Sequence, residues 1–175
     1  QQRTRYATWE QLLDYCTYSA NPVGRLYLHI IGYTDSTRHM LADATCTALQ
    51  LVNFWQDISR DAKMGRLYIP QQALQAAGVS ESDVFEARDS ASSAALAGQL
   101  CDYTRSFFER GLALLPMLPW PHRYNVRLFS AGGMAILRAV EQHQHTALSQ
   151  RPVLSRSQKC GLALRALLPR PLGGV

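Results

Sequence analysis

The chain has 175 residues, a formal net charge of +5 and 47% hydrophobic residues, which suits one domain with a sizeable core. No apolar run approaches the roughly 18 residues that span a bilayer, and no signal peptide is visible. The four cysteines are scattered without CxxC spacing, so we expect reduced thiols and a cytoplasmic location.

The order of capping and breaking residues predicts a row of helices and no strand. Thr8 and Gln11 form a capping pattern that opens a helix to about residue 20, and Asn21-Pro22 interrupts it before a helix over 24–33. A long helix is predicted from about residue 37 to 63, with a left-handed stop at Gly65. The remaining elements are an extended stretch over 66–70, a short helix to Ala77, a helix start at Ser80, and helices over 90–115, 124–150 and 155–168.

The segment QLVNFWQDISRDAKMGRLYIP, residues 50–70, places two carboxylates one helical turn apart. On a helix, Gln50, Asn53, Asp57 and Asp61 fall within an arc of about 80°. Two like charges at this spacing repel by a few tenths of a kcal/mol, and a shared cation reverses that cost. Mg²⁺ commonly uses one or two carboxylates and leaves its other positions to water and phosphate oxygens. The stripe therefore predicts a Mg²⁺–diphosphate site.

The alternative interpretation of the same stripe is a solvated helix face, with Arg60 pairing locally to Asp57. The neighbouring residues favour the metal site, because acids on an otherwise buried helix must be paired or bind a metal. The apolar neighbours are Leu51, Val52, Phe54 and Trp55.

These motifs resemble the squalene/phytoene synthase family. Its second aspartate-rich motif reads roughly Q-x-x-N-x-x-x-D-x-x-x-D, then G-R-x-Y-x-P. The matching residues are Gln50, Asn53, Asp57, Asp61, Gly65, Arg66, Tyr68 and Pro70. An upstream family motif, Y-C-x-Y-x-A-x-x-V-G, is matched by Tyr15, Cys16, Tyr18, Ala20, Val23 and Gly24. The stretches YCTYSANPVGRL, NFWQD, RLFSAGGMAILRAVE and RP-x-L-S are most similar to the bacterial hydroxysqualene-forming branch of hopanoid synthesis.

The resemblance covers nearly the whole chain and implies an all-α isoprenoid-synthase bundle. It implies that Asn53, Asp57 and Asp61 hold Mg²⁺, and that Tyr15 lies beside the departing diphosphate. Arg66 is expected to bind phosphate oxygens. The other residues expected to contact substrate are Ala20, Val23, Gly24, Gln50, Phe54 and Tyr68. Without the resemblance, the aromatic residues and the small residues are ordinary packing residues.

The implied reaction is Mg²⁺-assisted loss of diphosphate from presqualene diphosphate, with capture of water to give hydroxysqualene. One alternative is head-to-head condensation of farnesyl or geranylgeranyl diphosphate to squalene or phytoene. Another is an inactive helical fragment that acts through association or not at all. No glycine-rich dinucleotide motif is present, which favours a reaction without reduction.

The family's first aspartate-rich motif is missing from the sequence. No second D-x-x-x-D occurs; the nearest pair, Glu10 with Asp14, lies directly against Tyr15, where the family has no metal ligand. We therefore expect residues 1–175 to form a single domain that is the C-terminal portion of the family fold, and to be inactive alone. His145 also replaces a tyrosine that relatives carry four residues after the position of Glu141.

Basic residues gather in the C-terminal segment without any acid. They are Arg151, Arg156, Lys159, Arg165 and Arg170, and leucines are interleaved with them. This pattern predicts either a peripheral contact with an anionic membrane surface or the solvated basic face of a last bundle helix. No nucleic-acid-binding motif accompanies the basic residues, and we expect no nucleic-acid partner. His143 and His145 face different sides of a helix and do not form a metal site.

Overall fold

The computed structural model describes residues 4–166, with only the backbone described at residue 159 and over 163–166. All regular structure in this range is helical, as predicted, and no strand is present there. The α-helices are α1 (Trp9–Ser19), α2 (Asn21–Ile30), α3 (Ser36–Gln56), α4 (Ile58–Lys63), α5 (Gln71–Ala77), α6 (Glu81–Phe85), α7 (Ala91–Leu112), α8 (His122–Gln142) and α9 (Arg156–Ala166). Short 3₁₀ turns lie at Leu115–Met117 and Gln144–Thr146.

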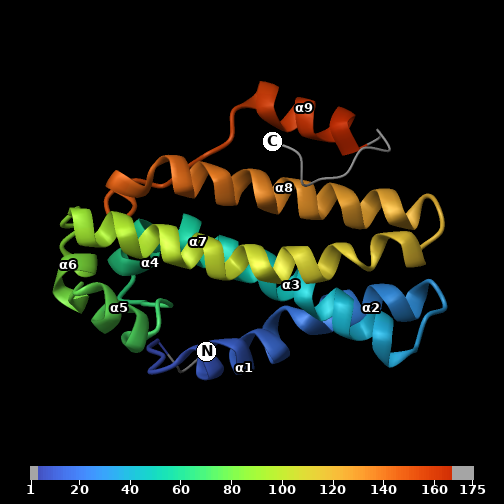
Figure 1. Ribbon diagram of the computed structural model, residues 1–175, viewed down its shortest axis with the longest axis horizontal. Helices are drawn as coiled ribbons and strands as arrows, with labels where there is room; N and C mark the ends of the chain where they lie inside the picture. Colours follow the sequence, from blue (N-terminus) through green and yellow to red (C-terminus); the bar gives the residue numbers. More distant parts are fainter. Residues whose placement is uncertain (1–3, 167–175) are drawn as a thin grey trace.

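The three long helices α3, α7 and α8 pack on one another and form the centre of the bundle (Figure 1). Helix α2 packs on the N-terminal half of α3, whereas α4, α5 and α6 gather near the other end. Helix α9 lies on the outer side of α8. The acidic motif at the end of α3 is therefore carried by the most central helix of the fold.

Close contacts fix α3 against its neighbours. The indole of Trp55 is buried, and its Nε1 donates a hydrogen bond of 2.8 Å to the Thr104 hydroxyl on α7. Gly111 lets α7 approach α3 closely, since a Cβ there would lie 2.2 Å from Oγ1 of Thr45. Gly133 does the same on α8, where a Cβ would lie 2.6 Å from both Leu49 and Phe108. These contacts set the position of the C-terminal end of α3.

The predicted long helix over 37–63 is wrong in one respect. Helix α3 ends at Gln56, and Asp57, with φ −101° and ψ 13°, separates it from α4. The backbone nevertheless stays close to helical, because Asp57 donates to the Asn53 carbonyl at 3.0 Å and Asp61 donates to the Asp57 carbonyl at 2.8 Å. The two acids therefore keep their separation of one turn, although they lie on either side of a kink.

Other predicted boundaries shift by a few residues. The first break falls at Ala20, and Asn21 begins α2 with Pro22 in its first turn, where a missing N–H removes no helical bond. Helix α7 ends at Leu112 and α8 at Gln142, both earlier than predicted, and a 3₁₀ turn follows each. The last predicted helix is observed as Arg156–Ala166, and residues 167–168 lie outside the described range.

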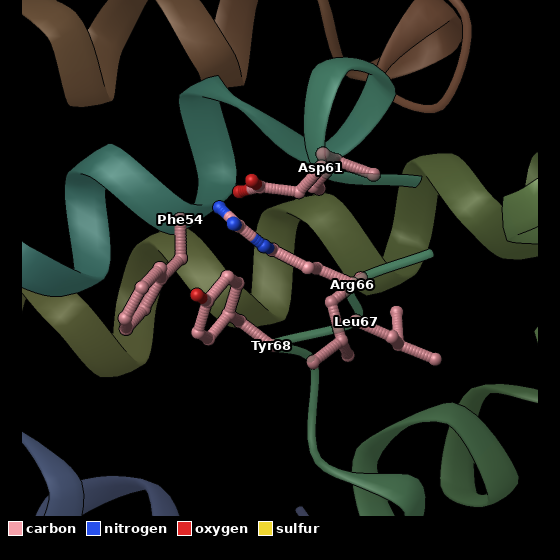
Figure 2. A pocket seen from close by; sticks show the side chains of 7 residues that line it. Phe54, Asp61, Arg66, Leu67 and Tyr68 are labelled. Carbon is pink, nitrogen blue, oxygen red and sulfur yellow. The ribbon is translucent and has the colours of Figure 1, made fainter. Parts of the chain in front are cut away.

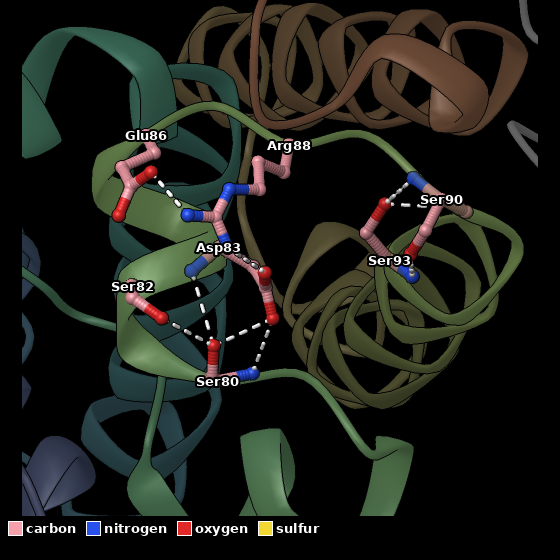
Figure 3. A network of polar contacts seen from close by, with 7 residues as sticks. All are labelled: Ser80, Ser82, Asp83, Glu86, Arg88, Ser90 and Ser93. Atoms are coloured by element: carbon pink, nitrogen blue, oxygen red, sulfur yellow. Dashed lines mark hydrogen bonds and ion pairs between the residues drawn. The ribbon is translucent and has the colours of Figure 1, made fainter.

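The predicted stops and caps are confirmed where glycine or a polar side chain marks them. Gly65 and Gly78 have φ of 70° and 66°, a conformation that glycine adopts without steric cost. Before α6, the Ser80 hydroxyl accepts from the Asp83 N–H at 3.1 Å, and the Asp83 carboxylate accepts from the Ser80 N–H at 3.0 Å (Figure 3). This reciprocal pair satisfies two backbone donors that the helix leaves open.

Within residues 4–166, no helix is both long and apolar enough to cross a membrane. All four cysteines are free thiols, as predicted, and two of them, Cys16 and Cys101, are buried. Burial raises the pKa of each of these two thiols to about 12.

Candidate active site

Two of the three predicted metal ligands, Asp57 and Asp61, lie at the junction of α3 and α4. Asp61 is partly buried, and its pKa is raised first by burial and then by the negative charge of Asp57. The positive charges of Arg66 and Arg60 lower the pKa of Asp61, but the two raising effects are larger. In Figure 2 the guanidinium of Arg66 points toward the Asp61 carboxylate. The acid pair is thus close enough for mutual repulsion, with a predicted phosphate-binding arginine beside it.

Asp57 forms an ion pair that no local pattern predicts. Nε of Arg151, in the segment between α8 and α9, donates to Oδ1 of Asp57. Beside it, the buried side chain of Gln56 donates a 2.7 Å hydrogen bond to the Pro152 carbonyl. The alternative in which Arg60 pairs with Asp57 is therefore replaced by a partner 94 residues away in sequence. The sequence marks this segment by the RP-x-L-S stretch and by its basic residues, but neither pattern predicts a contact with Asp57.

Three predicted aromatic residues meet in one cluster beside the acids. The rings of Phe54 and Tyr68 are stacked, with centroids 4.0 Å apart and planes at 10°. Tyr15 on α1 lies 6.1 Å from Phe54 and 6.3 Å from Tyr68, centroid to centroid. Phe54, Tyr68, Asp61 and Arg66 also line one small cavity of about 10 Å³ (Figure 2). The structure thus joins residues from three separate parts of the sequence into one wall.

The segment that carries Arg66 and Tyr68 is fastened to the beginning of the chain. Backbone N–H groups of Leu67 and Gln71 donate to the carbonyls of Thr4 and Tyr6 at 3.1 and 2.9 Å. The side chain of Arg5 also donates to the Gly65 carbonyl at 2.8 Å. The extended stretch after α4 is therefore held in place by main-chain bonds.

The two predicted amides lie upstream on α3. Asn53 is exposed, one turn before Asp57, and Gln50 is half-buried a further turn back. Their spacing places them on the same side of α3. The role of Asn53 as a metal ligand stays a prediction.

An apolar cavity of about 390 Å³ opens between α2, α3 and α8. Of the small residues predicted to line the substrate cavity, Val23 and Gly24 do so, together with Ala42. Ala20 is not among the lining residues, because it sits at the break between α1 and α2. Sequence reasoning missed the other lining residues, which are Tyr27, Leu28, Thr45, Cys46, Leu49, Leu114, Val126 and Phe129.

The cavity borders α3, and the acid pair lies just beyond the C-terminal end of the same helix. From Leu49 to Asp57 the rise along α3 is roughly 12 Å at about 1.5 Å per residue. Gly24 permits the close approach that shapes the cavity wall, since a Cβ there would lie 2.7 Å from the Cys46 sulfur and 3.3 Å from the Ala42 Cβ. A charged end and an apolar pocket are thus arranged one after the other along α3.

The donor set at the acids fits a hard divalent cation. Two carboxylates and a nearby amide are oxygen ligands of the type that Mg²⁺ takes, with phosphate and water completing its shell. Residues 4–166 contain no group of three or more His, Cys, Asp or Glu arranged to hold a metal. The histidines do not contribute, since His143 Nδ1 lies 2.8 Å from the Ala139 carbonyl and His145 is exposed. The oxygen donors of Asn53, Asp57 and Asp61 are therefore of the type that Mg²⁺ binds.

Residues 1–158 match the family described as squalene/phytoene synthase. A hydroxysqualene synthase from Zymomonas mobilis is 43% identical over 81 residues, which are 46% of this chain and 27% of that protein. The chloroplastic phytoene synthase 1 of Solanum lycopersicum is 28% identical over 163 residues, which are 90% of this chain and 40% of that protein.

Solved structures show the same architecture. A squalene synthase from Alicyclobacillus acidocaldarius superposes with a TM-score of 0.80 at 39% identity, over 83% of this chain and 55% of that one. A dehydrosqualene synthase reaches a TM-score of 0.79 at 21% identity, which shows the fold alone. In each comparison the chain spans less than two thirds of the relative.

Proposed function

Because the chain belongs to the squalene/phytoene synthase family, we propose that it supplies the C-terminal wall and half of the metal site of an enzyme that converts presqualene diphosphate to hydroxysqualene. The observation that carries the proposal is the arrangement along α3, where paired acids and an arginine lie at one end and an apolar cavity lies further along. This arrangement matches the two parts of a prenyl diphosphate. The similarity to hydroxysqualene synthases at about 40% identity favours this member of the family's reactions.

The residues at the charged end favour departure of diphosphate. Asp57 and Asp61, with Asn53, would hold Mg²⁺, which neutralises the charge that develops on the leaving diphosphate. Arg66 extends from the loop after α4 and can donate several N–H groups to phosphate oxygens. Tyr15 lies in the aromatic cluster next to these groups, in reach of a polar role beside the leaving group.

The residues of the wall suit the organic product of that step. Loss of diphosphate leaves a carbocation, which needs a dry surrounding and electron-rich faces rather than a base. The stacked rings of Phe54 and Tyr68 present such faces next to Asp61. The cavity lined by Val23, Gly24 and Ala42 gives an apolar place for the hydrocarbon. One water that adds to the cation, and then releases a proton to the departed diphosphate or to solvent, yields the alcohol.

Condensation to phytoene or squalene is the second candidate. The observation that favours it is the match to a phytoene synthase over 90% of this chain, a longer match than that to the hydroxysqualene synthase. Both candidate reactions use the acid pair. They differ in the substrate and in how the carbocation is converted to the final product. Peripheral contact with a membrane through the basic C-terminal segment remains a prediction for either candidate.

Product analysis in ¹⁸O-labelled water distinguishes these reactions. The chain is extended at its N-terminus by the corresponding part of a hydroxysqualene synthase relative and incubated with presqualene diphosphate and Mg²⁺. We expect an alcohol that carries solvent oxygen, formed without a nicotinamide cofactor. A hydrocarbon that forms only with the reduced cofactor, or from two farnesyl diphosphates, would favour the second candidate. The chain alone, with half of the acids, is expected to give no product.

A further inference from the structure

The segment between α8 and α9 is fastened to the body of the fold on both sides of Arg151. Before it, the Leu148 N–H donates to Oδ1 of Asp89 at 3.0 Å. After it, the Pro152 carbonyl accepts the 2.7 Å bond from Gln56, a residue that is 8% exposed. The backbone at Arg151 is therefore held in place on both sides, unlike that of an arginine on a mobile surface loop.

In this arrangement only one acid of the pair has an arginine partner among the described side chains. Asp57 receives Nε of Arg151, and its side chain is 23% exposed. Among the side chains that the structure describes, none forms such an ion pair with Asp61, and Asp57 contributes to the rise of its pKa. One carboxylate of the predicted metal site thus already has a cation from the protein, bound through a single oxygen.

We propose that Arg151 is the resident counter-cation of Asp57, so that a divalent cation must displace it or share the carboxylate with it. This inference rests on the proposed function, which makes Asp57 a metal ligand. Two positive charges at one carboxylate repel each other. The linkage is reciprocal: Arg151 weakens the binding of the metal at Asp57 by the same factor by which the metal weakens the contact of Arg151 with Asp57. The bond from Gln56 returns Arg151 to Asp57 whenever the metal leaves, because it keeps the neighbouring backbone in place.

The contact between Arg151 and Asp57 also explains how two repelling acids can lie one turn apart when no metal is bound. Paired acids at a helical kink repel each other, and in the absence of metal this repulsion opposes the fold. Arg151 offsets the charge of Asp57 in that state. Both acids can therefore be present as metal ligands, because in the metal-free protein Arg151 compensates the charge of one of them.

Binding of Mn²⁺ to this chain, followed by the electron paramagnetic resonance signal of the free ion, tests the proposal without substrate. We expect Arg151→Gln to bind Mn²⁺ about five- to tenfold more tightly than the wild type, at the lower end of typical coupling between two ligands. Arg151→Lys keeps the charge and should stay close to the wild type. Arg156→Gln is the matched control, since it removes an exposed positive charge in the neighbouring helix. Circular dichroism verifies that each variant keeps its helix content.

The acid variant separates the two proposals. Asp57→Asn should weaken Mn²⁺ binding, and in that background Arg151→Gln should bring no further gain. If Asp57→Asn binds as the wild type does, or if no chain binds Mn²⁺ at millimolar concentration, the metal role of Asp57 is wrong. If Asp57→Asn weakens binding while Arg151→Gln leaves it equal or weaker, the metal role stands and the counter-cation proposal is overturned. An equal gain in Arg156→Gln would reduce the effect to net charge and overturn it as well.

Discussion

Asp57 and Asp61 differ in their charged neighbours, although they come from one repeated pattern and both are partly buried. Burial and the charge of Asp57 raise the pKa of Asp61, whereas Asp57 has the guanidinium of Arg151 beside it. The identity of both residues could be predicted from the four-residue spacing within an apolar helix. Their unequal surroundings could not, because Arg151 reaches Asp57 from a segment 94 residues away.

The acids are expected to act in turnover and not in folding. In the chain extended by the N-terminal part of a relative, we expect Asp57→Asn or Asp61→Asn to lower the rate by orders of magnitude, through loss of charge stabilisation at the leaving diphosphate. The ellipticity at 222 nm should remain that of the unchanged protein. Ser82→Ala, at the exposed start of α6, provides a control that leaves the rate unaffected. Unaltered product formation by either acid variant would refute the role.

At the scale of helices, the sequence predicted the existence of each element better than its ends. Stops formed by Gly65 and Gly78 were predictable, because glycine alone adopts a positive φ freely. The kink at Asp57 was not, since the residues on both sides favour helix and the interruption depends on packing at the end of α3. The cavity wall was predictable at Val23 and Gly24 but not at Val126 or Phe129, because contacts between distant helices leave no local pattern.

Two adjacent glycines on α8 give a paired test of how the helices pack. At Gly133 a Cβ would lie 2.6 Å from the ring of Phe108, which is 1% exposed and cannot move aside, so Gly133→Ala should destabilise the fold by about 1–3 kcal/mol. At Gly132 nothing lies within 4 Å of the added methyl, and Gly132→Ala should stabilise α8 by up to about 1 kcal/mol. Urea unfolding measures both free energies. The same sign for both substitutions would contradict the packing of α8 on α3 and α7.

The cap of α6 gives a prediction about pH. Hydrogen bonds from the hydroxyl and the N–H of Ser80 lower the pKa of Asp83 in the folded chain (Figure 3). A lowered folded pKa means that the unfolded chain binds the proton more tightly. The contribution of Asp83 to stability is therefore full above its unfolded pKa of about 3.9 and is lost as the pH falls through the folded value.

We expect the difference in unfolding free energy between the wild type and Asp83→Asn to be constant near neutral pH. It should shrink below about pH 4, as the carboxylate takes up a proton. Thermal unfolding at several pH values measures it, and Asp14→Asn, on the exposed side of α1, is the comparison. A difference that grows toward acid pH would show that Asp83 does not act through its charged form.

At the scale of the whole molecule, large apolar side chains are exposed on one pair of helices. Tyr18 on α1 and Val23, Leu26 and Ile30 on α2 are between 59% and 77% exposed. Val23 also lines the apolar cavity, so the exposed residues continue into it. Contiguous apolar surface of more than a few hundred Å² on a soluble chain is usually an interaction site.

We therefore expect this chain by itself to self-associate or to bind a hydrophobic dye. The double substitution Leu26→Gln with Ile30→Gln should reduce both effects. Val153→Gln removes an apolar side chain that is 66% exposed elsewhere and should not. Sedimentation velocity and dye fluorescence measure the two effects. A monodisperse wild-type chain that leaves the dye dark would contradict the expectation.

The main-chain hydrogen bonds between residues 4–7 and 67–72 limit which sequence changes this part of the chain can accept in evolution. Such bonds depend on the backbone and not on the side chains, so substitutions at the exposed positions Thr4, Ala7, Gln71 and Gln72 should be tolerated. Insertion or deletion of one residue is different, because it slides every donor past its acceptor and moves Arg66 and Tyr68 away from the acids. At these exposed positions the number of residues is therefore under stricter constraint than their identity.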